Sequence, residues 1–142
     1  MRVGPTLDKL LADYPKDVRV VYKMHPLAMH QNAMPAAEAA MAANAQGKFA
    51  AMNEKLLANS ASLSRDKYLQ IATEIGLDMK RFTNDIDTHA YKASIDAQSE
   101  EAVKVGSTGT PASFVNGRFV SGAAPYDAFK TIIDEELAKA KK

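Results

Sequence analysis

A short segment near the carboxyl end of the sequence combines a Thr-Pro pair with the pattern of a β-hairpin. The segment runs from Ser107 to Val120 and reads STGTPASFVNGRFV. Asn116-Gly117 between two apolar runs is a strong indication of a tight two-residue turn. Proline has no N–H to donate in a sheet, so Pro111 fits only the first residue or the edge of a strand. The sequence therefore predicts a loop that ends at Pro111 and is followed directly by a hairpin.

A second segment concentrates methionine and histidine side chains. It contains Met24-His25 and His30, and methionines recur at Met29 and Met34. Thioethers and imidazoles are soft to borderline ligands that suit Cu(I), so this loop is a candidate copper site. The alternative is that the methionines end a strand or fill irregular gaps between the loop and the core. Their regular spacing matches neither a helix nor a strand, and we favour the second interpretation.

The sequence contains no cysteine. Disulfides, thiolate nucleophiles and zinc–thiolate sites are therefore excluded within this chain. The composition is otherwise that of an ordinary globular protein, with 46% hydrophobic and 25% charged residues in 142. A formal net charge of +1 without extended runs of like charge gives no indication of nucleic-acid binding. No stretch approaches the ~18 apolar residues that a membrane-spanning helix needs, and no signal peptide is recognised at the amino end.

The predicted elements begin with a helix that leads into a strand. The helix starts at Pro5, and the apolar run Val18–Tyr22 is predicted as a strand. A block of helices and the hairpin follow, and a final helix starts at Pro125. Three helices of the block are predicted to begin at the capping residues Ser64, Asp78 and Thr88. A connecting helix ordinarily has a strand before it, so this order is that of a βαβ unit without its first strand.

This order and several motifs resemble those of the DsbA-like thiol–disulfide oxidoreductases, which have a thioredoxin fold with a helical insertion. Gly109-Thr110-Pro111 matches the family's cis-proline loop, and Phe114 to Gly122 is similar to the hairpin that follows it. Other similar segments are His25-Pro26-Leu27 through His30, Ala33 to Ala40, Gln46-Gly47-Lys48-Phe49, Gly76-Leu77-Asp78, and Ala124-Pro125-Tyr126 with Phe129. The resemblance extends from Arg2 to about Ala138, nearly the whole chain.

The resemblance implies an α/β, thioredoxin-like domain over residues 1–142, with the helical insertion at about 35–106. Family members carry Cys-x-x-Cys at the start of the first helix, and by this alignment its second cysteine would stand just before Met1. The family's first strand, which is central in its sheet, and its catalytic dithiol are then both missing. We interpret the chain as a truncated family member, assign it no catalytic residue, and expect it to be redox-inactive as written.

The resemblance also assigns substrate binding to Gly109, Thr110 and Pro111. In the family, a cis-proline lets the residue before it offer its N–H and C=O groups to an extended polypeptide, which is binding by strand addition. His30 is the histidine most similar to a family position. For His30 the sequence leaves two alternatives, an accessory role near the redox centre or a surface position in the loop. We favour the surface position. No metal and no cofactor are expected.

The family oxidises or isomerises protein disulfides in the bacterial periplasm or cell envelope, so the resemblance implies unfolded or cysteine-containing polypeptides as partners. The alternative is a redox-silent module that binds extended polypeptide or Cu(I). Loss of a central strand would leave unpaired strand edges, which favour association. We therefore expect a homo-oligomer formed by strand or domain exchange, with no nucleic-acid partner and no membrane span.

Overall fold

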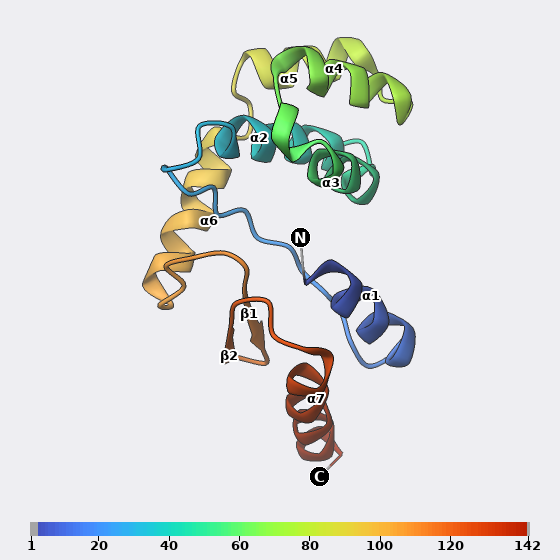
Figure 1. Ribbon diagram of the computed structural model, residues 1–142, viewed down its shortest axis with the longest axis vertical. Coiled ribbons are helices and arrows are strands. Elements are labelled where there is room, and N and C mark those ends of the chain that lie inside the picture. Colours follow the sequence, from blue (N-terminus) through green and yellow to red (C-terminus); the bar gives the residue numbers. More distant parts are fainter. Residues whose placement is uncertain (1–2, 142) are drawn as a thin grey trace. The chain divides into compact units, whose positions relative to one another are not determined.

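The computed structural model describes residues 3–141, and these divide into two compact units (Figure 1). One, the sheet unit, contains the chain up to Tyr22 and from Gly106 onward. The other, the helical unit, is Lys23–Val105. Each unit has a hydrophobic core of its own.

The sheet unit consists of two helices and a hairpin. α1 (Gly4–Asp13) has Pro5 in its first turn, where the missing N–H has no intrahelical partner to lose. β1 (Ala112–Val115) and β2 (Arg118–Ser121) pair antiparallel. α7 (Tyr126–Ala140) begins directly after Pro125. The predicted hairpin and both predicted helices are confirmed.

The hairpin turns at Asn116-Gly117, as predicted. Their φ angles are 48° and 84°, and positive φ at both positions is what a type I′ turn requires. Alternation then divides the side chains of the hairpin between two faces. Val115 and Val120 belong to the core of the sheet unit. Phe114 and Phe119 lie on the other face, exposed, with their ring centres 5.1 Å apart.

A small apolar core and a polar cluster join α1 to α7. The buried core residues of the sheet unit are Val3, Leu10, Val120, Phe129 and Ile133. Beside this core, Lys9 and Asp13 of α1 form an ion pair of 2.7 Å, and the Tyr126 hydroxyl of α7 donates to the same carboxylate. The Lys9 ammonium also lies 4.3 Å from the centre of the Tyr126 ring, a cation–π contact.

A second cluster repeats this arrangement with the helices exchanged. Lys130 and Asp134 of α7 form an ion pair, and the hydroxyl of Tyr14, at the end of α1, donates to Asp134 over 2.6 Å. Hydrogen bonds from the lysine and the tyrosine hold the pKa of Asp134 below its ordinary value, and the same causes lower the pKa of Asp13. The two Lys–Asp–Tyr clusters therefore attach α1 to α7 by charge-assisted hydrogen bonds.

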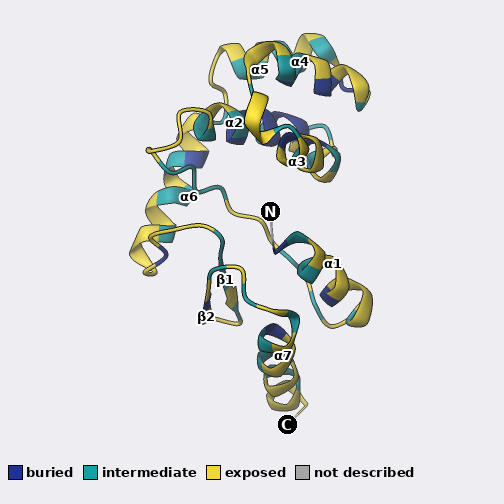
Figure 2. Ribbon diagram, viewed as in Figure 1, coloured by how far each residue is buried: buried dark blue, intermediate teal, exposed yellow. Residues whose placement is uncertain are grey.

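The helical unit is built around the alanine-rich helix α2 (Ala33–Asn44). α3 (Phe49–Ala58), α4 (Arg65–Glu74), α5 (Met79–Asp87) and α6 (Lys92–Lys104) all contact it, and a short 3-10 turn, η1 (Ser60–Ser62), follows α3. Figure 2 shows much of α2 buried. Its small side chains let the neighbouring helices approach closely, and larger side chains on those helices, such as Met52 and Phe82, fill the core.

The structure confirms two of the predicted helix starts and corrects the third. Ser64 and Asp78 each accept a hydrogen bond from a backbone N–H in the first turn of the helix that follows. Thr88 does not begin a helix, because it caps the carboxyl end of α5. His89 follows in a left-handed conformation, with a φ of 53°, and the chain turns before α6 starts at Lys92.

The predicted strand at Val18–Tyr22 is wrong. The sheet formed by residues 3–141 has two strands, β1 and β2, and residues 18–22 belong to neither. A strand depends on ladder hydrogen bonds to a neighbour, and no neighbouring strand pairs with this segment in the described part of the chain. Its apolar composition was therefore not sufficient evidence for a place in the sheet.

The two Lys–Asp–Tyr clusters predict acid sensitivity of the sheet unit. Because the folded-state pKa of Asp13 and Asp134 is lowered, their stabilisation is present above the unfolded pKa of about 4 and is lost as the pH falls through the folded pKa. We expect Asp13→Asn and Asp134→Asn to be less stable than the parent at neutral pH and to lose less stability on acidification. Asp17→Asn, at an exposed position in the turn after α1, is the matched control.

Denaturant unfolding of each variant at several pH values between about 7 and 3 measures this effect. Identical pH dependence in the parent and in both cluster variants would show that the clusters do not stabilise the folded state.

Candidate functional site

The residues assigned to substrate binding form the loop that leads into β1. Gly109 and Thr110 are exposed, and half-buried Pro111 directly precedes the strand. The peptide bond between Thr110 and Pro111 is cis. Buried Ser107 donates through its hydroxyl to the Gly109 carbonyl over 3.5 Å. Within residues 3–141 the backbone of Thr110 forms no hydrogen bond, so its N–H and C=O groups can accept a partner.

Among the described residues β1 pairs with β2 alone, so the other edge of β1 has no strand beside it. The tight turn closes on Val115 and Arg118, which are opposite each other and form a hydrogen-bonded pair. Bonded and non-bonded pairs alternate along an antiparallel ladder. The backbone N–H and C=O groups of Ala112 and Phe114 therefore point away from β2, toward the unpaired edge.

A salt bridge holds the end of the hairpin on α7. Arg118 of β2 binds Glu135 over 2.5 Å and Glu136 over 3.4 Å. The two glutamates raise the pKa of Arg118, and Lys139 together with Arg118 lowers the pKa of Glu136. Glu135 is exposed, whereas Arg118 and Glu136 are partly buried, and we assign the salt bridge a structural role because Arg118 lies on the face of the hairpin that packs on α7.

The loop and the strand edge offer backbone hydrogen bonds, and the sequence supplies no thiol beside them. Main-chain groups at an exposed strand can bind an extended polypeptide by strand addition with little dependence on its sequence. No group of three or more His, Cys, Asp or Glu side chains that could hold a metal ion is found between residues 3 and 141. The loop and the strand edge can therefore offer main-chain hydrogen bonds to an extended chain, and the sequence supplies no cysteine nucleophile.

His30 lies in the helical unit, in the turn before α2. Its backbone N–H bonds to the Leu27 carbonyl over 3.0 Å, and its residue is exposed. An exposed position in the loop is the one favoured from the sequence, and an accessory role for His30 stays the untested alternative.

The methionines of the Met–His segment lie in different environments. Met24 is half-buried and its N–H donates to the Gln98 side chain over 2.7 Å, Met34 is half-buried in α2, and Met29 is 80% exposed. The interpretation that these methionines fill gaps is therefore wrong for Met29. Both ring nitrogens of His25 are buried without a hydrogen-bond partner in the part of the chain that the structure describes. Copper binding by this segment stays the less favoured, untested alternative.

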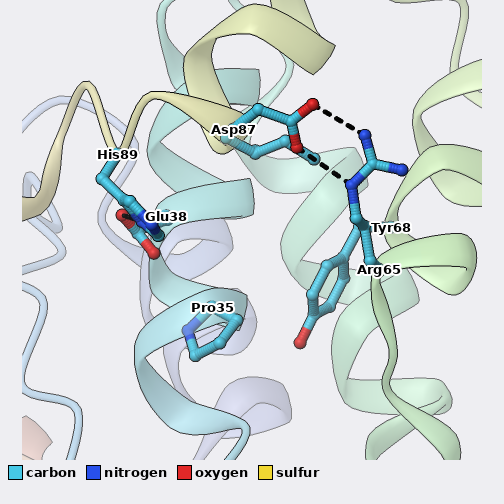
Figure 3. Close-up of a pocket in the computed structure, with 7 residues that line it drawn as sticks. Pro35, Glu38, Arg65, Tyr68, Asp87 and His89 are labelled. Carbon is cyan, nitrogen blue, oxygen red and sulfur yellow. Dashed lines mark hydrogen bonds and ion pairs between the residues drawn. The ribbon is translucent and has the colours of Figure 1, made fainter.

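Sequence analysis missed a cavity in the helical unit (Figure 3). It has a volume of about 230 Å³ and lies among α2, α4 and α5. The residues that line it are Pro35, Glu38, Arg65, Tyr68, Ile86, Asp87 and His89. These residues are dispersed along the sequence and form no local motif. One signal was available, because Glu38 is the single charged residue within the alanine-rich run 36–45.

Comparison with known proteins identifies the family. The model of the DSBA-like thioredoxin domain matches residues 3–134. The chain belongs to the DSBA-like thioredoxin domain family. A thioredoxin-like oxidoreductase from Silicibacter pomeroyi DSS-3 has a similar structure, with a TM-score of 0.81 and 28% identity, and the match covers 96% of this chain and 78% of that chain. The predicted family and the predicted thioredoxin-like fold with a helical insertion are confirmed.

This DSBA-like domain is also similar to part of several antiporters. The Na⁺/H⁺ antiporter NhaA 1 of Mycobacterium sp. (strain KMS) is 33% identical over 136 residues, which is 92% of this chain and 22% of the antiporter. The antiporter NhaA 3 of Salinispora tropica is 36% identical over 139 residues, 96% of this chain and 21% of the antiporter. The chain thus spans about a fifth of the length of these curated relatives. Between residues 3 and 141, no helix has the length and apolar character needed to cross a membrane.

Proposed function

We propose that this DSBA-like domain binds extended polypeptide through the Gly109–Pro111 loop and, as the 142-residue chain, catalyses no thiol–disulfide exchange. The observation that carries the proposal is the exposed backbone of Thr110, which has no hydrogen bond within residues 3–141 and directly precedes Pro111 and β1. The family assignment supports it, because the similar solved structure is that of a thioredoxin-like oxidoreductase.

Binding at this loop uses the main chain. A bound peptide in an extended conformation donates an N–H to the Thr110 carbonyl and accepts a hydrogen bond from the Thr110 N–H. Main-chain hydrogen bonds of this kind supply affinity without reading the peptide's sequence, whereas pockets for side chains would supply specificity. Unfolded polypeptides, which present extended backbone, are therefore the class of partner that we propose.

The lack of exchange activity follows from the chemistry of the reaction. A disulfide is broken when a thiolate attacks one of its sulfur atoms, so a chain without cysteine has no nucleophile for that step. A hydroxyl group does not replace the thiolate without an adjacent base to activate it. Exchange that involves this domain therefore needs cysteines from a longer protein or from another chain.

The cellular setting is also a proposal. We propose that the domain spans residues 1–142, with a helical insertion at about 35–106. We place this domain in the bacterial cell envelope, because DSBA-like domains typically act outside the cytoplasm. The antiporters match this chain over about a fifth of their length, so ion transport is not part of the proposed function.

We further propose that the unpaired edge of β1 accepts a strand from a second copy of the chain. The backbone groups of Ala112 and Phe114 point to that edge, and the exposed ring of Phe114 contacts that of Phe119 on the face of the hairpin turned away from the core. An edge with free N–H and C=O groups is a template for a further strand. Exchange of a strand or a larger element between identical chains then produces a homo-oligomer.

The first test concerns catalysis. The 142-residue chain should reduce insulin, and should oxidise a reduced unfolded protein, no faster than the uncatalysed background. A longer variant that carries a strand and Cys-x-x-Cys before Arg2 should gain activity, and the same variant with Ser-x-x-Ser should not. Exchange above background by the cysteine-free chain would contradict the proposed function.

The second test concerns peptide binding by the Thr110 backbone. Thr110→Pro removes the N–H group, whereas Thr110→Val keeps the backbone and the shape of the side chain. In a fluorescence-anisotropy titration with a labelled, permanently unfolded polypeptide, we expect Thr110→Pro to weaken binding about fivefold or more, the effect of one lost hydrogen bond. Thr110→Val should bind like the parent. Equal affinity of Thr110→Pro and the parent would argue against main-chain recognition at this loop.

The third test concerns association through β1. Ala112→Pro removes an N–H that points to the unpaired edge of β1 and leaves the hairpin ladder intact. Ser121→Pro, at the opposite position of β2, removes the matching N–H on the far edge and is the control. Light scattering over a dilution series should show association of the parent and of Ser121→Pro, and a shift to monomer for Ala112→Pro. A parent that remains a compact monomer at every concentration would exclude association.

A further inference from the structure

Methionine carries all of the sulfur in this protein, because the sequence has seven methionines and no cysteine. A peroxide oxidises the thioether sulfur to a sulfoxide, which methionine sulfoxide reductases convert back to methionine. Met1 lies outside the described residues, and the other methionines are Met24, Met29, Met34, Met41, Met52 and Met79. An oxidant has to reach the sulfur atom, so the exposure of each side chain decides how fast it reacts.

All of the described methionines except Met29 are shielded by the helical unit. Met52 is 0% exposed and belongs to the core of this unit. Met79 packs against the same core, and its Sδ accepts a hydrogen bond from the Thr73 hydroxyl over 3.5 Å. The partly buried methionines are Met24, Met34, Met41 and Met79. A peroxide reaches a buried sulfur only when the surrounding structure opens, and opening of a packed core is rare.

Met29 lies at the tip of a turn and is 80% exposed. The turn runs from Leu27 to His30, and it is closed by a hydrogen bond of 3.0 Å from the His30 N–H to the Leu27 carbonyl. The His30 carbonyl then accepts a hydrogen bond of 2.9 Å from the N–H of Ala33, the first residue of α2. Backbone groups alone form both bonds, so the turn does not depend on the Met29 side chain.

The product of oxidation has different consequences at exposed and buried positions. A sulfoxide is polar, so it disrupts an apolar core such as the one that contains Met52. The sulfur of Met29 is already in contact with water, and its oxidation removes no buried apolar contact of comparable size. The helical unit should therefore keep its fold when Met29 alone is oxidised.

We propose that Met29 is the residue within residues 3–141 that a peroxide oxidises first, and that the sulfoxide forms reversibly on the folded chain. The observations that carry this proposal are the exposure of Met29, the shielding of the other described methionines and the absence of cysteine from the sequence. It does not depend on the proposed function.

The reaction with hydrogen peroxide is a two-electron oxygen transfer. The Met29 sulfur attacks one peroxide oxygen, so that an S–O bond forms while the O–O bond breaks. The sulfur is oxidised, the peroxide is reduced, and the second oxygen leaves as water after proton transfer. A methionine sulfoxide reductase, with a thiol as the electron donor, then removes the oxygen and restores the thioether.

The test exposes the 142-residue chain to a small molar excess of hydrogen peroxide and follows each methionine by mass-spectrometric peptide mapping. Met29 should gain one oxygen atom about tenfold faster or more than Met52, whose reaction has to wait for local opening. When Met29 is oxidised, the melting temperature should equal that of the untreated chain, and two reductases, one for each sulfoxide epimer, should restore the original mass. Equal rates at Met29 and another described methionine, a lowered melting temperature, or a sulfoxide that both reductases leave unchanged would overturn the proposal.

Substitutions separate reactivity from stability. In Met29→Leu the other described methionines should react at their slow rates, whereas in Met41→Leu, the matched control in α2, Met29 should react as in the parent. Glutamine imitates the polarity of the sulfoxide. Met29→Gln should melt like the parent, and Met52→Gln should melt at a lower temperature or fail to fold. Equal destabilisation by these two glutamine substitutions would contradict the claim that the fold tolerates oxidation at Met29.

Discussion

Backbone hydrogen bonding is the constraint on which the sheet unit depends. A strand satisfies its N–H and C=O groups only when another strand lies beside it. β1 has such a neighbour in β2, and within residues 3–141 it has none on its other side. Residues 18–22 have an apolar, strand-like sequence, but among the described residues they belong to neither strand of the sheet. The unpaired edge of β1 can therefore form further backbone hydrogen bonds. The Thr110 backbone, which forms no hydrogen bond within residues 3–141, can do the same, and we propose that a polypeptide partner binds to these groups.

The remaining contacts of the sheet unit hold this edge in place. The core around Leu10 and Phe129 joins α1, α7 and the hairpin, and the two Lys–Asp–Tyr clusters attach the same helices from outside. None of these contacts involves a thiol, because the sequence has none. A DSBA-like domain therefore has this loop and hairpin geometry in a sequence without cysteine, and we propose that polypeptide binding at the loop does not require a dithiol.

Local signals in the sequence were sufficient for most of the elements. Asn116-Gly117 predicts the hairpin, and Ser64 and Asp78 predict two helix starts, because turn and cap chemistry involve residues close in sequence. Features that depend on distant partners were not predictable in this way. The prediction of a strand at residues 18–22 was wrong because no strand within residues 3–141 pairs with this segment. Thr88 caps the end of α5 and does not start α6. The cavity beside Glu38 arises only when three helices assemble.

Amide hydrogen exchange in the sheet unit tests the central claim most directly. In a dilute solution of the 142-residue chain, the amides of Ser113 and Val115, which face β2, should be protected, whereas those of Ala112 and Phe114 should exchange rapidly. Addition of an unfolded polypeptide, which we propose to bind at the Thr110 backbone, should slow exchange at the Thr110 amide. Strong protection of Ala112 and Phe114 in the dilute chain, or no change at Thr110 with polypeptide, would contradict the account.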